Sequence, residues 1–170
     1  PKRKFKGRVV FLGNNVSDEN NDQALFAGMS SAPASMEAAK ACDAYGLAPG
    51  HEIQQCDAEQ AYIQSKLGGN ETWIRMPPAF RKPEWKHMKD PVCRLVLSLY
   101  GHPDSGSYWE KHCEEHLKRA GYIPIKDWKS CFFHPKLKLF LVVYVDVFKM
   151  SGPASHVAGT VSYTHLRAHE

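Results

Sequence analysis

The chain has 170 residues, of which 43% are hydrophobic and 24% charged, with a formal net charge of +4. This length and composition indicate one globular domain or part of one and exclude an intrinsically disordered protein. The longest uninterrupted apolar run, residues 139–145, is far shorter than the roughly 18 residues of a membrane span, and no apolar segment of a signal peptide follows the basic N-terminus.

Two further features concern the origin of the chain. The first residue is Pro1 rather than methionine, which favours a piece of a longer protein. The five cysteines contain no Cys-x-x-Cys pair, so we expect reduced, mostly buried thiols in an intracellular protein.

The first predicted element is a strand over residues 5–12. Lys6 and Arg8 share one face of it, because side chains along a strand alternate with a period of two. They belong to a group of five basic residues among the first eight. Such a group either attracts phosphate or forms a solvated basic edge.

Helices and strands alternate along the rest of the chain. A helix is predicted over residues 34–45 with Gly46 as its C-terminal cap, and another over 108–120 with a capping box from Ser107 and Glu110. Strands are predicted over residues 52–57, 72–76, 92–100, 130–133 and 137–145, a helical stretch over 58–67 and an exposed loop over 81–90. This order predicts an α+β fold with a mostly antiparallel sheet packed on helices.

Two carboxylates stand at the ends of predicted strands. Asp146 follows the apolar run, where a buried and unpaired carboxylate would be strongly unfavourable. It therefore lies in an exposed turn, pairs with a cation or binds a metal. Asp57 ends an earlier strand and is either the N-cap of the following helix or a second metal ligand. Two such carboxylates on one sheet edge would suit Mg²⁺ and phosphoryl transfer.

Seven short motifs together resemble the reverse transcriptases of copia-type retrotransposons. In chain order they are Lys6-x-Arg8-Val-Val, Gln55-Cys-Asp57-Ala-Glu-Gln-Ala61-Tyr62-Ile63-x-x-x-Leu67, Trp73-Ile-Arg-Met76-Pro-Pro78-Ala-Phe80, Leu95-x-x-Ser98-Leu-Tyr-Gly101, Trp109, Gly121-Tyr122 and Tyr144-Val-Asp146. Each motif alone is weak, but their order and spacing follow the family pattern from about residue 4 to 150. The resemblance divides the chain into a fingers and palm fragment, residues 1–150, and a tail, residues 151–170.

The resemblance implies the fingers and palm of a right-hand polymerase, incomplete here, and RNA-directed DNA synthesis. Asp57 and Asp146 would be the catalytic carboxylates of a two-metal nucleotidyl transfer and would hold Mg²⁺, or Mn²⁺ in its place. Lys6 and Arg8 would contact the triphosphate of the incoming nucleotide. Tyr62 would lie under its sugar and exclude a 2′-hydroxyl, although a tyrosine in such a helix otherwise packs in the core.

The implied partners are an RNA or DNA template-primer, deoxynucleoside triphosphates and the rest of the Pol polyprotein, with its integrase and RNase H domains. No membrane is implied. The implied location is a cytoplasmic particle or the nucleus.

The chain departs from the family pattern at several positions. Val147 replaces the second aspartate of Tyr-Val-Asp-Asp, which removes one carboxylate beside Asp146. Asp104 and Ser107 replace a Gln and an Arg of the family, so those nucleotide contacts are not carried over. Residues 161–170 match nothing in the family and look like translated cloning or adaptor sequence.

Two other readings remain open from the sequence. His112, Cys113 and His116 have metal-ligand residue types, and the two histidines have the i, i+4 spacing of a zinc pair on a helix, although no Cys-Cys or His-Glu set accompanies them. Alternatively, Val147 and the short chain indicate a degenerate element fragment without activity.

Overall fold

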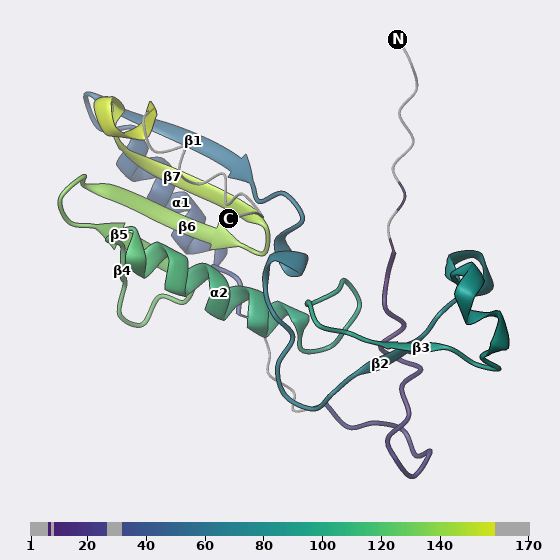
Figure 1. Ribbon diagram of the computed structural model, residues 1–170. Helices are drawn as coiled ribbons and strands as arrows, with labels where there is room; N and C mark the ends of the chain where they lie inside the picture. The colour runs from purple at the N-terminus through teal and green to yellow at the C-terminus, as the bar shows by residue number, and fades with distance from the viewer. Residues whose placement is uncertain (1–6, 8, 27–31, 159–170) are drawn as a thin grey trace.

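The computed structural model describes residues 7, 9–26 and 32–158. Among these, five strands form one antiparallel sheet in the order β1-β7-β6-β5-β4 (Figure 1). The strands are β1 (His51–Asp57), β4 (Ile123–Pro124), β5 (Cys131–His134), β6 (Leu139–Tyr144) and β7 (Val147–Pro153). Together with two α-helices this sheet confirms the predicted α+β fold with a mostly antiparallel sheet.

The two helices cover opposite faces of the sheet, and the alternation of β6 explains why. Its odd-numbered residues Leu139, Leu141 and Val143 pack with α2 (Ser105–Arg119) in one core. Its even-numbered residues Phe140 and Val142 pack in a second core with α1 (Met36–Gly46). Because both faces are covered, β6 is apolar along its whole length rather than alternating. We call the five-stranded sheet with α1 and α2 the body.

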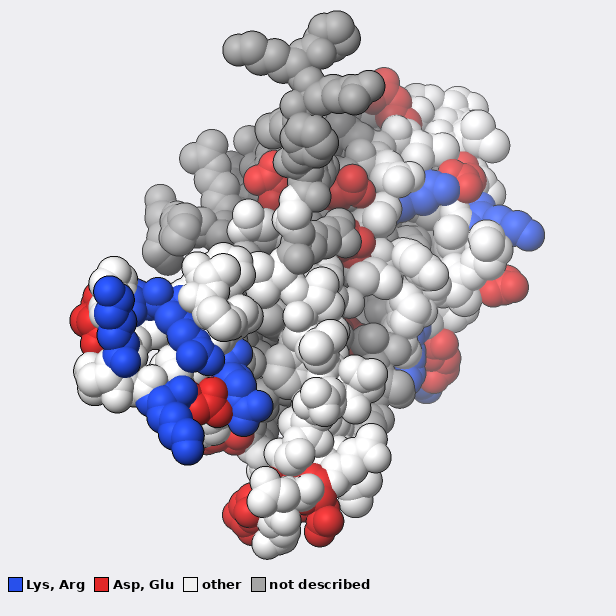
Figure 2. Space-filling view, turned by 90° about the vertical axis from the view of Figure 1, so that its right-hand side faces the viewer, with Lys and Arg blue, Asp and Glu red and all other residues white. Residues whose placement is uncertain are grey.

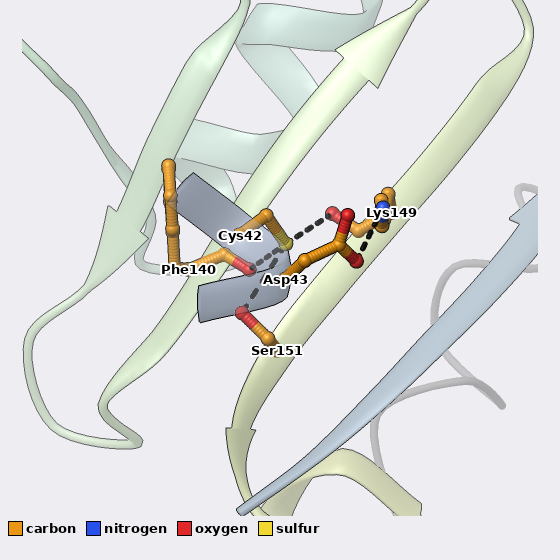
Figure 3. A network of polar contacts seen from close by, with 5 residues as sticks. All are labelled: Cys42, Asp43, Phe140, Lys149 and Ser151. Carbon is orange, nitrogen blue, oxygen red and sulfur yellow. Dashed lines mark hydrogen bonds and ion pairs between the residues drawn. The ribbon is translucent and has the colours of Figure 1, made fainter. Parts of the chain in front are cut away.

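A polar network joins α1 to the sheet inside the second core (Figure 3). The Sγ atom of Cys42 lies 3.2 Å from the hydroxyl oxygen of Ser151, within hydrogen-bonding distance. The carboxylate of Asp43 forms an ion pair with the ammonium of Lys149 at 2.5 Å. Burial is the main cause that raises the pKa of the Cys42 thiol. None of the five cysteines forms a disulfide and three of them are buried, as predicted. These contacts fix the position of α1 on β7.

A second unit projects from the body between β1 and α2 (Figure 1). It consists of β2 (Trp73–Arg75) paired antiparallel with β3 (Val92–Arg94) and two 3₁₀ helices, η2 (Pro78–Phe80) and η3 (Pro83–His87). We call residues 72–95 the arm. Residues 81–90 are mostly exposed, as predicted, but η3 gives them regular structure.

Several predicted elements are wrong or shorter. Residues 9–12 of the first predicted strand are not in a strand, and Phe11 instead donates its amide to the carbonyl of Tyr100 at 2.7 Å. The helix predicted over 58–67 is only η1 (Ala61–Gln64), because Gln60 adopts a left-handed conformation with φ 53° that interrupts it. The strand predicted over 92–100 ends at Arg94.

The predicted helix ends also need correction. Helix α2 begins at Ser105, so Ser107 lies inside it and forms no capping box; Glu110 instead accepts a hydrogen bond from the amide of Ala32. Gly46 is the last residue of α1 rather than its cap, and its role is packing: a Cβ there would lie 2.1 Å from Cγ1 of Ile53. The Gly121 cap is confirmed, because Gly121 has φ 93° and its amide donates a hydrogen bond to the carbonyl of Lys118.

Strands β4 and β7 were not predicted. Strand β7 extends to Pro153 and pairs with β1 along its whole length, from Asp57 opposite Val147 to His51 opposite Pro153. Beyond it, the Val157 side chain is buried in the α2 core. Residues 151–158 are therefore part of the folded body. Which residues belong to the fingers and palm fragment stays a prediction.

Candidate active site

The firmest sequence feature, Tyr144-Val145-Asp146, lies at a tight hairpin between β6 and β7. Tyr144 pairs with Val147, so Val145 and Asp146 form a two-residue turn. Val145 has φ 56°, which is unusual for a β-branched residue because its side chain crowds the backbone in the left-handed region. The hairpin thus presents Asp146 in a conformationally costly turn at the end of strands β6 and β7.

The register of the sheet brings Asp57 to this same end of the strands. Asp57 is the last residue of β1 and is the strand partner of Val147, the residue that follows Asp146. The amide of Ala58 donates to the carbonyl of Asp146 at 2.7 Å, which ties the two chain segments together. Two aspartates that are 89 positions apart in the sequence are thereby brought together by the backbone register of the sheet.

Neither carboxylate is occupied by a helix cap or an ion pair among the described residues. Asp57 is exposed and caps no helix, since the residue that precedes η1 is Gln60. Asp146 is half-buried in the turn, and among the described residues neither aspartate forms an ion pair. Both therefore remain able to accept a cation.

Tyr62 lies close to the hairpin. Its ring packs against that of Tyr100 with centroids 4.5 Å apart. Burial raises the pKa of Tyr62, and the charges of Tyr100 and Asp146 act in the same direction, so the phenol is neutral at physiological pH. Tyr62 and Val145 also line a common cavity of about 40 Å³ beside Trp109. Tyr62 therefore lies beside the hairpin turn that carries Asp146.

Helix α2 holds the turn through a hydrogen bond from one of its side chains. The indole of Trp109 donates a hydrogen bond of 2.7 Å to the carbonyl of Val145. Trp109 is only 2% exposed, so the bond is shielded from water. The sequence marked Trp109 as part of the apolar stripe and of the family pattern, but no local signal showed that its indole would hold the turn.

The donor set fits one Mg²⁺ ion better than two. Mg²⁺ takes one or two carboxylates and fills its shell with water and phosphate oxygens, which suits Asp57 and Asp146. A search of the described residues finds no group of three or more His, Cys, Asp or Glu side chains that could hold a metal. Val147, which follows Asp146 and pairs with Asp57 on the neighbouring strand, adds no carboxylate to the pair.

The other positions that the family pattern singled out lie outside the described residues or at the start of α2. Lys6 and Arg8 lie outside the described residues. Asp104 precedes the first turn of α2 but makes no capping hydrogen bond with its side chain, and Ser107 is buried within the helix.

The histidine pair on α2 does not form a zinc site with Cys113. The rings of His112 and His116 lie with centroids 4.2 Å apart, and Nδ1 of His116 contacts the carbonyl of His112 at 2.8 Å. Cys113 faces the core, where burial raises the pKa of its thiol to about 12. A thiol that stays protonated is a poor zinc ligand.

Comparison with known proteins places the chain near retrotransposon polyproteins. The transposon Ty1-BL Gag-Pol polyprotein of Saccharomyces cerevisiae is 30% identical over 94 residues, which is 55% of this chain and 5% of the relative. The truncated transposon Ty1-A Gag-Pol polyprotein of the same yeast is 30% identical over 92 residues, 54% of this chain and 7% of the relative. No family model and no solved structure matches the chain.

The extent of these matches sets what they show. The similarity covers about half of this chain, and the chain spans about 5% of the length of the first of these curated relatives. In addition, no described helix has the length and apolar character to cross a membrane. The matches support a relationship between this chain and a short segment of the Gag-Pol polyprotein of copia-type retrotransposons.

Proposed function

We propose that this chain is a fingers and palm fragment of the RNA-directed DNA polymerase of a copia-type retrotransposon. The observation that carries the proposal is the pairing of Asp57 with Val147, which brings Asp57 and Asp146 to the same end of the sheet. The similarity to Gag-Pol polyproteins supports the same origin. In this proposal Asp57 and Asp146 are the carboxylates of a nucleotidyl transfer site.

Each residue of the site has a proposed role. Asp57 and Asp146 would hold Mg²⁺, which when bound stabilises the charge that develops on the attacking and leaving oxygens of phosphoryl transfer. The neutral phenol of Tyr62 would meet the sugar of the incoming deoxynucleotide and exclude a 2′-hydroxyl by its bulk. Trp109 is a positioning residue that holds the turn through the Val145 carbonyl.

The proposed setting follows from the same origin. The partners would be a template-primer, deoxynucleoside triphosphates and the remaining domains of Pol. The location would be a cytoplasmic particle or the nucleus.

Val147 limits what this site does as it stands. An aspartate at this position would add a third negative charge to the pair, and cation affinity at oxygen sites rises with the number of charged ligands. We therefore expect the present chain to bind divalent cations weakly and not to extend primers, and the variant Val147→Asp to gain affinity.

Manganese binding tests the site directly, because Mn²⁺ substitutes for Mg²⁺ and its free form is measured by electron paramagnetic resonance. Val147→Asp should tighten Mn²⁺ binding roughly tenfold. Asp57→Asn or Asp146→Asn in that background should abolish the gain. The matched control is Glu52→Gln, which removes a carboxylate from the far end of the same strand and should change nothing.

Primer extension tests the reaction itself. A primed RNA template, deoxynucleotides and Mg²⁺ or Mn²⁺ are supplied to the chain, to a full-length version with Val147→Asp, and to that version with Asp57→Asn as well. We expect extension only by the full-length version in which all three carboxylates are present. Templated extension by the unaltered chain would contradict the effect assigned to Val147, and extension that survives Asp57→Asn in the Val147→Asp background would overturn the role assigned to Asp57.

A further inference from the structure

The arm carries a concentrated positive charge that the proposed active site does not use. Residues 72–95 contain six Lys or Arg residues against two acidic residues, so this short segment has the same net charge, +4, as the whole chain. Figure 2 shows the side from which the arm projects, and Lys and Arg side chains gather there in one cluster that surrounds a smaller area of acidic surface. Such a surface favours a polyanionic partner.

The arginines and lysines of the arm differ in their partners. Arg75 pairs with Asp90 at 2.7 Å, Arg81 approaches the same carboxylate at 3.7 Å, and Arg94 pairs with Glu71 at 2.9 Å. The remaining cations are Lys82, Lys86 and Lys89, which lie in and around η3. All three are exposed, and none forms an ion pair with another described residue. The arginines thus have acidic partners in or beside the arm, while the lysines are available to an external anion.

Aromatic rings lie among these lysines. Phe80 is 61% exposed although it is a large apolar side chain. Trp85, in η3, is partly exposed, and the ammonium of Lys82 lies 5.7 Å from its ring centroid. A cationic surface that follows a phosphate backbone, combined with rings on which bases stack, is the arrangement by which proteins bind single strands without sequence preference.

We propose that the arm binds single-stranded nucleic acid, with Lys82, Lys86 and Lys89 contacting phosphates and Phe80 and Trp85 stacking on bases. A duplex is the poorer ligand because its bases already stack on each other and offer no free face. This site uses neither Asp57 nor Asp146, so it operates without a divalent cation. It is a binding surface beyond the proposed nucleotidyl transfer site.

Fluorescence anisotropy with a labelled oligothymidylate of about 20 nucleotides tests the electrostatic part, using the whole chain in EDTA. Changing Lys82, Lys86 and Lys89 to alanine should weaken binding at least roughly tenfold and reduce the slope of log affinity against log salt by about 2, since each phosphate contact contributes about 0.7. The control changes Lys126, Lys129 and Lys136 to alanine. These lysines are also exposed, and the net charge falls equally. Equal losses in the two variants would overturn the proposal.

The aromatic part has its own test. Trp85→Leu should weaken single-strand binding roughly tenfold and leave binding of a duplex of equal length unchanged, whereas Trp85→Phe keeps a ring and should retain most of the affinity. Preference for the duplex, or binding of phosphatidylserine vesicles without binding of the oligonucleotide, would contradict the proposal. Asp57→Asn combined with Asp146→Asn should bind the strand normally, so this result is independent of whether the carboxylates form an active site.

Discussion

The body and the arm are stabilised in different ways. In the body, β6 buries five of its six residues between α1 and α2. In the arm, both residues at the ends of β2 and β3 are exposed, and ion pairs to Asp90 and Glu71 support the two short strands. Surface ion pairs contribute little to stability, so the arm has few interactions that resist local opening. The body therefore provides a rigid support for Asp57 and Asp146, while the arm exposes charged and aromatic side chains.

The largest expected effect comes from one buried side chain of the body. Phe148 in β7 is 1% exposed and packs in the α2 core, so Phe148→Ala should lower the free energy of unfolding by about 3–5 kcal/mol, measured by urea denaturation. Phe80→Ala is the matched change in the arm, where the ring is 61% exposed, and should cost no more than about 0.5 kcal/mol. Similar losses in the free energy of unfolding at both positions would contradict the view that the body, and not the arm, is stabilised by buried side chains.

The same contrast explains which parts of the fold the sequence predicted. The strand over residues 137–145 was predicted because an uninterrupted apolar run marks a strand covered on both faces. Strand β7 was missed because Lys149 and Ser151 interrupt its apolar pattern. The structure accepts them because Asp43 and Cys42 on α1 provide partners. Those partners come from a helix more than one hundred residues away, which no local pattern reveals.

The candidate site was predicted only in part for a similar reason. Asp57 and Asp146 were each identified at the end of a strand, and family resemblance supplied their shared role. Their closeness depends on the pairing of β1 with β7, a strand that was not predicted. The indole bond from Trp109 to Val145 depends on where α2 docks, so it was also beyond the sequence.

A close contact between α1 and β1 gives the next largest effect. A Cβ on Gly46 would meet Cγ1 of Ile53 at 2.1 Å and Cβ of Ser151 at 3.1 Å, so Gly46→Ala should destabilise the body by about 1–3 kcal/mol. Adding Ile53→Ala removes the clashing Cγ1 atom and should restore part of the loss, which a double-mutant cycle in urea measures. Strictly additive losses would contradict a direct clash between these two residues.

The turn that carries Asp146 should respond in the opposite direction. Val145 is held at φ 56°, a conformation that costs a residue with a Cβ about 1–2 kcal/mol and glycine almost nothing. Val145→Gly should therefore stabilise the hairpin by up to about 1 kcal/mol, after allowance for the greater flexibility of glycine in the unfolded chain. Val145→Ala, which keeps a Cβ, is the control and should not stabilise. If both variants lose stability equally, the turn stores no strain.

The smallest expected effect lies where the arm joins the body. The ring of His102 is 6% exposed, packs near the rings of Phe11 and Phe26, and contacts the hydroxyl of Thr72 at 3.2 Å. Burial lowers the pKa of His102 below its ordinary value of 6.5, although the charge of Asp104 acts the other way. The folded chain therefore favours the neutral ring.

The sign of the pH dependence follows from this lowered pKa. Below pH 6.5 the unfolded chain takes up a proton at His102 before the folded chain does, so stability falls as the pH drops from that value toward the folded pKa and then levels off. Urea midpoints measured at about pH 7.5 and 5.5 should show the decrease, in a range above the ordinary titration of Asp and Glu. His102→Gln, which retains a polar group for Thr72, should make the decrease smaller, whereas His87→Gln on the exposed surface of η3 should not. An unchanged decrease in His102→Gln would assign it to other groups, such as His112, whose pKa burial also lowers.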